Sequence, residues 1–151
     1  MEDSFAEKLE RLEFYRSEIK MEYDLLSNRM SAYVTSQSFL CIAFATSMGN
    51  LNPHWGNIFN FVFPLALAII GIAASIQSHR GISAAFETIA LWHLKQDNLF
   101  ESEPSLDDYR LNTERETIQQ RGLSFAKWSP LIFIFAWFIF GTLTIVLHLI
   151  V

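Results

Sequence analysis

Charged residues are missing from one long stretch of this chain, although 18% of its 151 residues are charged. No Lys, Arg, Asp or Glu occurs between Leu51 and His79. Because charged side chains are costly in the hydrocarbon core of a bilayer, such a stretch is typical of a membrane span. The formal net charge of -5 also excludes the general basic surface that nucleic-acid binding requires. We therefore expect a lipid bilayer, and no nucleic acid, among the partners.

Residues that carry chemistry are also few. Cys41 is the only cysteine, which excludes an internal disulfide framework and a cysteine-based zinc site. The four histidines are scattered, and the nearest approach to a metal pair is His93 with Asp97, a spacing more typical of a solvated helix pair. No Gly-rich phosphate loop, GxSxG or HExxH sequence is present. We expect that the chain is not an enzyme and has no catalytic residue, metal or cofactor.

What the chain does have is three apolar segments of the length that a membrane span needs, which is ~20 residues. They are residues 31–48, 55–77 and 128–151, and none contains Asp, Glu, Lys or Arg. Pro64 marks a candidate kink in the second segment. The predicted fold is therefore an all-α membrane protein with three transmembrane helices. The remaining segments are an amphipathic helix over 1–30, an external turn over 49–54 and a helical cytoplasmic region over 78–127.

The basic residues predict how these spans are oriented. All 11 Lys and Arg residues lie either before residue 31 or between residues 78 and 127, and the 49–54 connection has none. Because cytoplasmic loops carry the excess of Lys and Arg, the N terminus is expected in the cytoplasm and the C terminus outside. The first 30 residues have no apolar core behind a basic start, so we expect no signal peptide.

Before the first span, the sequence has a heptad pattern. One series of apolar residues recurs every seven positions: Phe5, Leu12, Ile19, Leu26 and Tyr33. A second series lies four residues after each of the first four and is apolar except at Arg16: Leu9, Arg16, Tyr23 and Met30. No Pro or Gly occurs from residue 1 to 48, so this helix can run unbroken into the first span. Leu12, Ile19 and Leu26 are thus predicted to pack against the other cytoplasmic helix, copies of the same helix in a coiled coil, or lipid headgroups. The helix has eight acidic residues against five basic ones, so an anionic lipid surface is the least favoured of the three.

The second span is expected to continue as a cytoplasmic helix that carries small residues in steps of three and four. They are Gly71, Ala74, Ser78, Gly81 and Ala85. Such a stripe allows another helix to approach closely, within one subunit or between subunits. Gly81 also marks a candidate break, because Gly costs about 1 kcal/mol in a helix interior. After Asn98 the sequence predicts a loop, followed by a polar helix from about Leu106 to Gln120.

Polar residues without charge are present in the first two spans. Thr35 and Ser38 lie near one face of the first span with Gln37 beside them, and Asn60 lies in the second. Hydrogen bonds to the helix backbone or between helices are one interpretation. The alternative is that copies of the first span line a weakly polar pore, which requires a homo-oligomer because three spans hardly enclose water.

A family resemblance follows from the stretch SNRMSAYVTSQSFLCIAFAT, residues 27–46, where a basic residue and small polar residues precede an aromatic-led apolar run. With the amphipathic helix before it, this part of the chain resembles the two-span bacterial effector modules called SLATT and the small RipA-like membrane proteins. The third apolar segment has no counterpart in the two-span pattern. The resemblance implies a homo-oligomer in the bacterial inner membrane and, for SLATT, an antiphage effector that perturbs the membrane. The other hypothesis is a non-conducting membrane scaffold that recruits a cytoplasmic protein.

Overall fold

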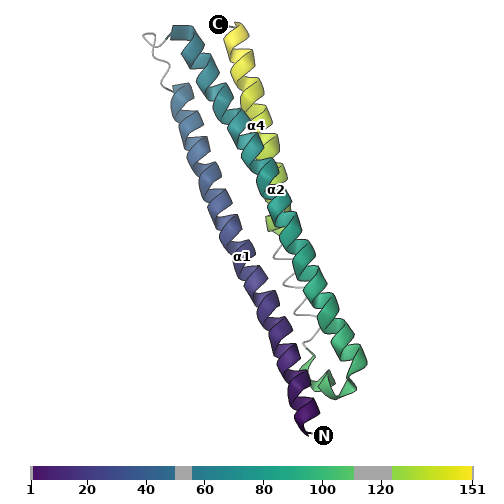
Figure 1. Ribbon diagram of the computed structural model, residues 1–151. Coiled ribbons are helices and arrows are strands. Elements are labelled where there is room, and N and C mark those ends of the chain that lie inside the picture. Colours follow the sequence, from purple (N-terminus) through teal and green to yellow (C-terminus); the bar gives the residue numbers. More distant parts are fainter. Residues whose placement is uncertain (1, 50–55, 111–123, 151) are drawn as a thin grey trace. The chain divides into compact units, whose positions relative to one another are not determined.

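The computed structural model describes residues 2–49, 56–110 and 124–150, and almost all of these residues are helical (Figure 1). The helices are α1 (Glu2–Gly49), α2 (Gly56–Ser102), the 3-10 helix η2 (Pro104–Tyr109) and α4 (Ser124–Ile150). The predicted all-helical class is therefore confirmed. Two helical segments, Ile58–Ser102 and Phe125–Ile150, are long and apolar enough to cross a membrane. The predicted first span, 31–48, forms the second half of α1.

The helices form two compact units. Unit 1 contains residues 1–29 and 82–125, and unit 2 contains residues 30–81 and 126–151. Both α1 and α2 contribute to each unit, whereas η2 belongs to unit 1 and α4 lies almost wholly in unit 2.

In unit 1 the first half of α1 lies beside the second half of α2 (Figure 1). The heptad residues Leu12, Ile19 and Leu26 are 0%, 8% and 1% exposed, so each is buried within the chain. On this part of α2 the buried residues lie in steps of three, four or seven up to Leu99, as a helix with one buried face requires; they are Ile82, Ala85, Ile89, Gln96 and Leu99, followed by Phe100. The predicted heptad of α1 is thus occupied by packing inside unit 1.

The end of α2 differs from the sequence-based prediction. The prediction of a loop directly after Asn98 is wrong for residues 99–102, because α2 continues to Ser102. Leu99 and Phe100 are buried in one cluster with Leu12 and Leu106, and this packing holds the last turn of α2 in helical form. The polar helix predicted over 106–120 is described only over its first residues, which belong to η2, and the remainder lies outside the described residues.

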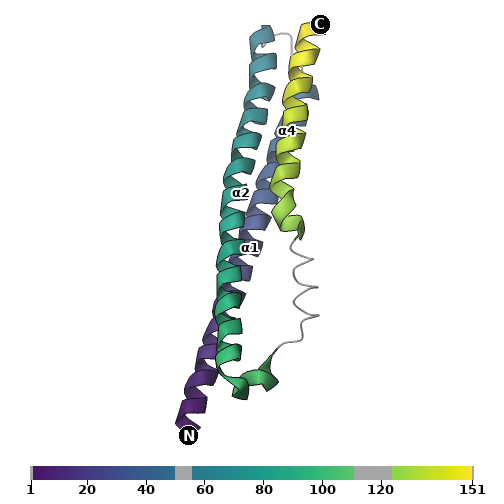
Figure 2. The ribbon, with the colours of Figure 1, turned by 90° about the vertical axis from the view of Figure 1, so that its right-hand side faces the viewer.

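Unit 2 consists of three helices that lie side by side: the second half of α1, the first half of α2, and α4 (Figures 1 and 2). Phe44, Leu67, Ala68 and Trp137 form its buried apolar cluster, with residues from all three helices. Pro64 is buried within α2, and the helix continues through both Pro64 and Gly81 to its end. Of the external turn predicted over 49–54, Gly49 belongs to α1 and residues 50–54 lie outside the described part of the chain.

Candidate functional site

The most distinctive site of unit 2 is a buried polar cluster that joins its three helices. We define it as Tyr33 and Gln37 of α1, Gly71 and Ser75 of α2, and Trp137 of α4. Gln37, Ser75 and Trp137 are each 0% exposed, and Tyr33 is 5% exposed. Polar groups at such depth are costly unless they are hydrogen-bonded, so their pairing decides how these helices associate.

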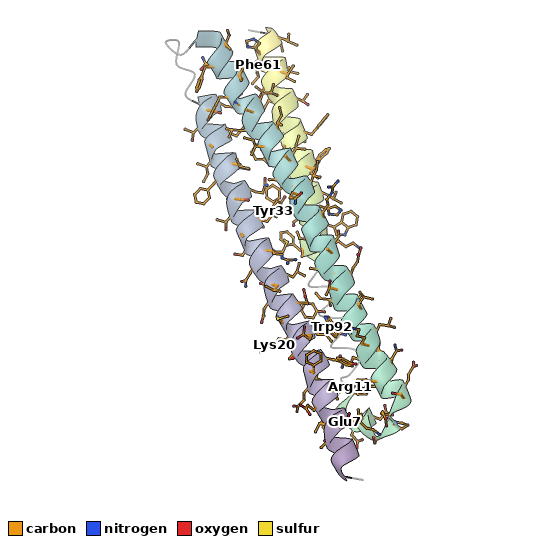
Figure 3. The ribbon with its side chains drawn as sticks, viewed as in Figure 1. Glu7, Arg11, Lys20, Tyr33, Phe61 and Trp92 are labelled. Carbon is orange, nitrogen blue, oxygen red and sulfur yellow. The ribbon has the colours of Figure 1, made fainter. Side chains whose placement is uncertain are left out.

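The first half of the polar cluster joins α1 to α2. The Tyr33 hydroxyl donates a hydrogen bond to the Ser75 hydroxyl at 2.9 Å. The Ser75 hydroxyl in turn donates to the Gly71 carbonyl at 2.8 Å, within the same helix. Tyr33 also makes an edge contact with Phe133 of α4, with ring centroids 5.6 Å apart. Figure 3 labels Tyr33, which lies on α1 toward α2.

The second half joins α1 to α4. The indole Nε1 of Trp137 donates to Oε1 of Gln37 at 2.6 Å. Both side chains are fully buried, so neither group exchanges this bond for one with water. Nε2 of Gln37 is buried and has no hydrogen-bond partner among the described residues. The amide of Gln37 is therefore used for one hydrogen bond between helices and is not presented on the surface of unit 2.

The heptad explains why α1 presents Tyr33 and Gln37 to its neighbours. Tyr33 is the last apolar position of the predicted stripe, and a step of four residues leads to Gln37. Further steps of three and four reach Leu40 and Phe44, which pack in the apolar cluster of unit 2. Phe44 contacts Trp137 edge-on at 6.0 Å between ring centroids, so the indole is fixed by packing as well as by its hydrogen bond.

At Gly71 the backbone of α2 lies directly against the Trp137 side chain of α4. It is buried, and a Cβ placed there would overlap the indole ring of Trp137 at Cε2, Cδ2 and Nε1. Of the other small residues predicted to pack helices, Ala74, Ser78 and Gly81 are half-buried. A Cβ added at Gly81 meets no atom within 4 Å. Of the two glycines in the predicted stripe, Gly71 is therefore the one at which another helix approaches closely.

The residues predicted to face a pore are placed differently from one another. Gln37 lies inside unit 2, as described above. Thr35 and Ser38 are exposed, and the Ser38 hydroxyl donates to the Val34 carbonyl of its own helix at 2.9 Å. Asn60 is half-buried. These four residues are not gathered on one face.

Trp137 and Ser75 are the members of the polar cluster that sequence reasoning missed. Trp137 lies in the middle of the last apolar segment, away from the interfacial positions that tryptophan favours in membranes. A tryptophan in that position has an N–H group that needs an acceptor, and this was the available signal. The identity of the acceptor required the packing of α1 against α4.

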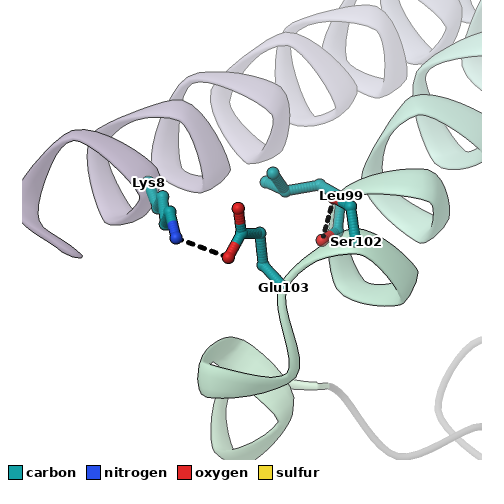
Figure 4. Close-up of polar contacts among 4 residues, drawn as sticks. All are labelled: Lys8, Leu99, Ser102 and Glu103. Atoms are coloured by element: carbon teal, nitrogen blue, oxygen red, sulfur yellow. Dashed lines mark hydrogen bonds and ion pairs between the residues drawn. The ribbon is translucent and has the colours of Figure 1, made fainter. Parts of the chain in front are cut away.

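Unit 1 has polar contacts of its own around η2. Nζ of Lys8 forms an ion pair with Glu103 at 2.5 Å (Figure 4). Arg16, which breaks the heptad, donates from its guanidinium to the Tyr109 carbonyl at 2.5 Å. The sequence irregularity at Arg16 is thus explained by a contact that fixes the end of η2 against α1.

Aromatic side chains of α1 and α2 also contact one another in unit 1. Trp92 of α2 is labelled in Figure 3. Its ring centroid lies 5.9 Å from those of both Phe14 and Tyr15 of α1. Nζ of Lys95 lies 3.9 Å from the centroid of the Trp92 ring. The His93 Nε2 and the Tyr23 hydroxyl are 3.5 Å apart, at the limit of a hydrogen bond. Over the ranges that the structure describes, no group of three or more His, Cys, Asp or Glu residues is placed to hold a metal ion.

No protein-family model matches the chain, and neither a curated protein nor a solved structure is detectably similar to it. The function must therefore be inferred from the contacts of the two units.

Proposed function

We propose that the chain is a three-span membrane protein that acts as a non-conducting scaffold. In this proposal unit 2 anchors the chain in a bacterial inner membrane, with the N terminus in the cytoplasm and the C terminus outside. Unit 1 is then a cytoplasmic helical surface that recruits another protein. The orientation comes from the distribution of Lys and Arg.

The outer surface of unit 2 supports the membrane assignment. Its exposed side chains include many large apolar residues, from Phe39 and Ile42 on α1 to Ile69 on α2 and Phe135 on α4, between 59% and 68% exposed. Water would penalise such a surface, whereas lipid tails solvate it. The described part of unit 2 also has no Asp, Glu, Lys or Arg between residues 31 and 49, 56 and 79, or 128 and 150.

The observation that carries the non-conducting assignment is the hydrogen bond between Gln37 and Trp137. A water-filled pore needs polar groups on its wall, and Gln37 is the strongest such group in the first span. Its carbonyl is bonded to Trp137 and its side chain is fully buried in a single chain. Tyr33 and Ser75 are likewise bonded to one another. The buried polar groups thus hold helices together.

The test is ion leakage from vesicles that contain the purified full-length chain. A scaffold leaves potassium efflux at the level of empty vesicles, for the wild type and for Gln37→Leu alike. Gln37→Leu should instead weaken the folded state. Efflux above that of empty vesicles, abolished by Gln37→Leu with assembly intact, would refute the proposal.

A channel-like, membrane-perturbing effector, as in antiphage defence, is the second candidate function. It is favoured by Thr35 and Ser38, whose side chains are exposed on α1 and would be available to line a path between copies of the chain. Replacing both by Leu separates the two candidates. The double variant should stop efflux if copies of α1 line a pore and should have no effect on a scaffold.

A further inference from the structure

In addition to the heptad that is buried within the chain, α1 has a second one that remains largely exposed. In unit 1 this second series consists of Phe14, Glu18, Met21, Leu25 and Asn28, which alternate in steps of four and three. We call these five residues the outer seam. Phe14, Met21 and Leu25 are 50%, 47% and 40% exposed. They lie on the side of α1 away from the buried heptad of Leu12, Ile19 and Leu26. The Phe14 ring also contacts Trp92 of α2 edge-on, so Met21 and Leu25 are the apolar seam residues that carry the inference.

We infer that the outer seam is the surface through which a second copy of this chain binds, with the two α1 helices parallel. This inference rests on the topology of the proposed function, because two chains with their N termini on the same side of one membrane can pair only in parallel. Residues that alternate in steps of three and four match a parallel pair of helices. In a left-handed coiled coil such residues stay at the interface, opposite the same residues of an identical helix.

Charge complementarity identifies a copy of this chain as the occupant. In a parallel pair, residues that flank the seam on opposite sides and are five positions apart face each other across the interface. Asp24 and Arg29 occupy such positions and have opposite charges. They are five residues apart on one helix, so they point in different directions and do not pair within it. Both are exposed, and neither forms an ion pair with another residue in the described ranges. A symmetric pair of chains joins Asp24 of each copy to Arg29 of the other.

Glu18 limits the strength of this association. It lies within the outer seam between Phe14 and Met21, so the two copies bring their Glu18 carboxylates together. A like-charge layer in a coiled-coil seam weakens pairing without changing its register. The seam therefore predicts a weak dimer in dilute micelles that becomes populated when the membrane confines both chains.

The same spacing continues along α1 into unit 2, in residues whose side chains are also exposed. They are Ala32, Thr35, Phe39 and Ile42. Small residues at the first two positions permit close approach of helices in lipid. The surface that pairs outside the bilayer thus has a continuation of the same type on the same helix.

Disulfide cross-linking of full-length chains in phosphatidylethanolamine and phosphatidylglycerol vesicles tests the inference. In a Cys41→Ala background, Met21→Cys and Leu25→Cys should form dimers at several-fold higher yield than Lys20→Cys and Ser27→Cys. The two control positions are exposed on the same helix but lie outside the outer seam. Equal yields at all four positions, or no dimer at any, would overturn the inference and leave lipid headgroups or a different protein as the occupant.

Charge exchange provides a second, independent readout. Asp24→Arg should weaken dimerisation roughly 2- to 30-fold, as expected for the loss of two exposed ion pairs. Adding Arg29→Asp should restore it, and Glu18→Leu should tighten the wild-type dimer. Failure of the double exchange to restore pairing would contradict the parallel register.

The topology is tested separately by labelling a Glu10→Cys variant from either side of the membrane. Dimers at Met21 together with outside labelling would support the seam and refute the proposed orientation. Labelling only from the cytoplasm without dimers would refute the seam and leave the proposed function standing.

Discussion

Two glycines on the same helix should respond in opposite ways to the same substitution. Gly71 and Gly81 both lie inside α2, and helix propensity alone favours Ala over Gly at each by about 1 kcal/mol. At Gly81 an added methyl group meets no atom within 4 Å, so Gly81→Ala should leave stability unchanged or raise it by up to about 1 kcal/mol.

At Gly71 the added methyl group would overlap the indole of Trp137. The ring has no room to retreat, because it is 0% exposed and contacts both Phe44 and Phe140. Overpacking of this kind costs about 1–3 kcal/mol. A shift of the ring also weakens its hydrogen bond to Gln37, at a cost of about 1 kcal/mol. After the gain in propensity is subtracted, Gly71→Ala should destabilise unit 2 by about 1–3 kcal/mol.

The assay is reversible unfolding in mixed micelles with increasing dodecyl sulfate, followed by circular dichroism. Gly71→Ala should unfold at a lower dodecyl sulfate fraction than the wild type, and Gly81→Ala at the same or a higher one. If Gly71→Ala were as stable as Gly81→Ala, the close approach of α2 and α4 at Trp137 would be refuted.

Three further predictions, which use four substitutions, test the contacts of each unit. Gln37→Leu and Trp137→Phe should each destabilise the chain. A double-mutant cycle of the two in micelles should give a coupling energy of about 0.6–2 kcal/mol. No coupling would mean that the hydrogen bond between Gln37 and Trp137 is not formed. Leu12→Ala should lower the free energy of unfolding by about 2–5 kcal/mol, because Leu12 is 0% exposed in its cluster. An unfolding titration that shows a loss below about 1 kcal/mol would argue against that packing. Lys8→Ala should lower the free energy of unfolding by less than about 1 kcal/mol, because the side chains of Lys8 and Glu103 are 32% and 28% exposed. A larger loss in the same titration would show that this ion pair holds η2 in place.

Periodicity made the packing of α1 predictable. Residues such as Leu12, Ile19 and Leu26 recur every seven positions, and a helix places them on one face whatever their partner is. The sequence left three partners open for that face. The structure buries it within unit 1, so the surface of α1 that we infer to bind another copy is the exposed outer seam.

The role of Gln37 was open for a different reason. A polar residue in an apolar segment is equally compatible with a pore wall and with a hydrogen bond between helices. The choice depends on what lies across from it, and Trp137 is 100 residues away in sequence. Local pattern has no information about a contact of that separation.

The sequence by itself determined the helical class, because apolar periodicity and the absence of Pro and Gly over residues 1–48 permit little else. It also indicated two segments, within Ile58–Ser102 and Phe125–Ile150, that are apolar enough to cross a membrane, since that depends on composition and length; the span predicted over 31–48 stays a prediction. Only the tertiary structure decided that Gly71 adjoins Trp137, that Gln37 accepts a hydrogen bond from it, and that α2 continues to Ser102. The first two features are contacts between helices, and the third depends on the packing of Leu99 and Phe100 against Leu12 and Leu106. The energy of each depends on side chains that the chain brings together only when it folds.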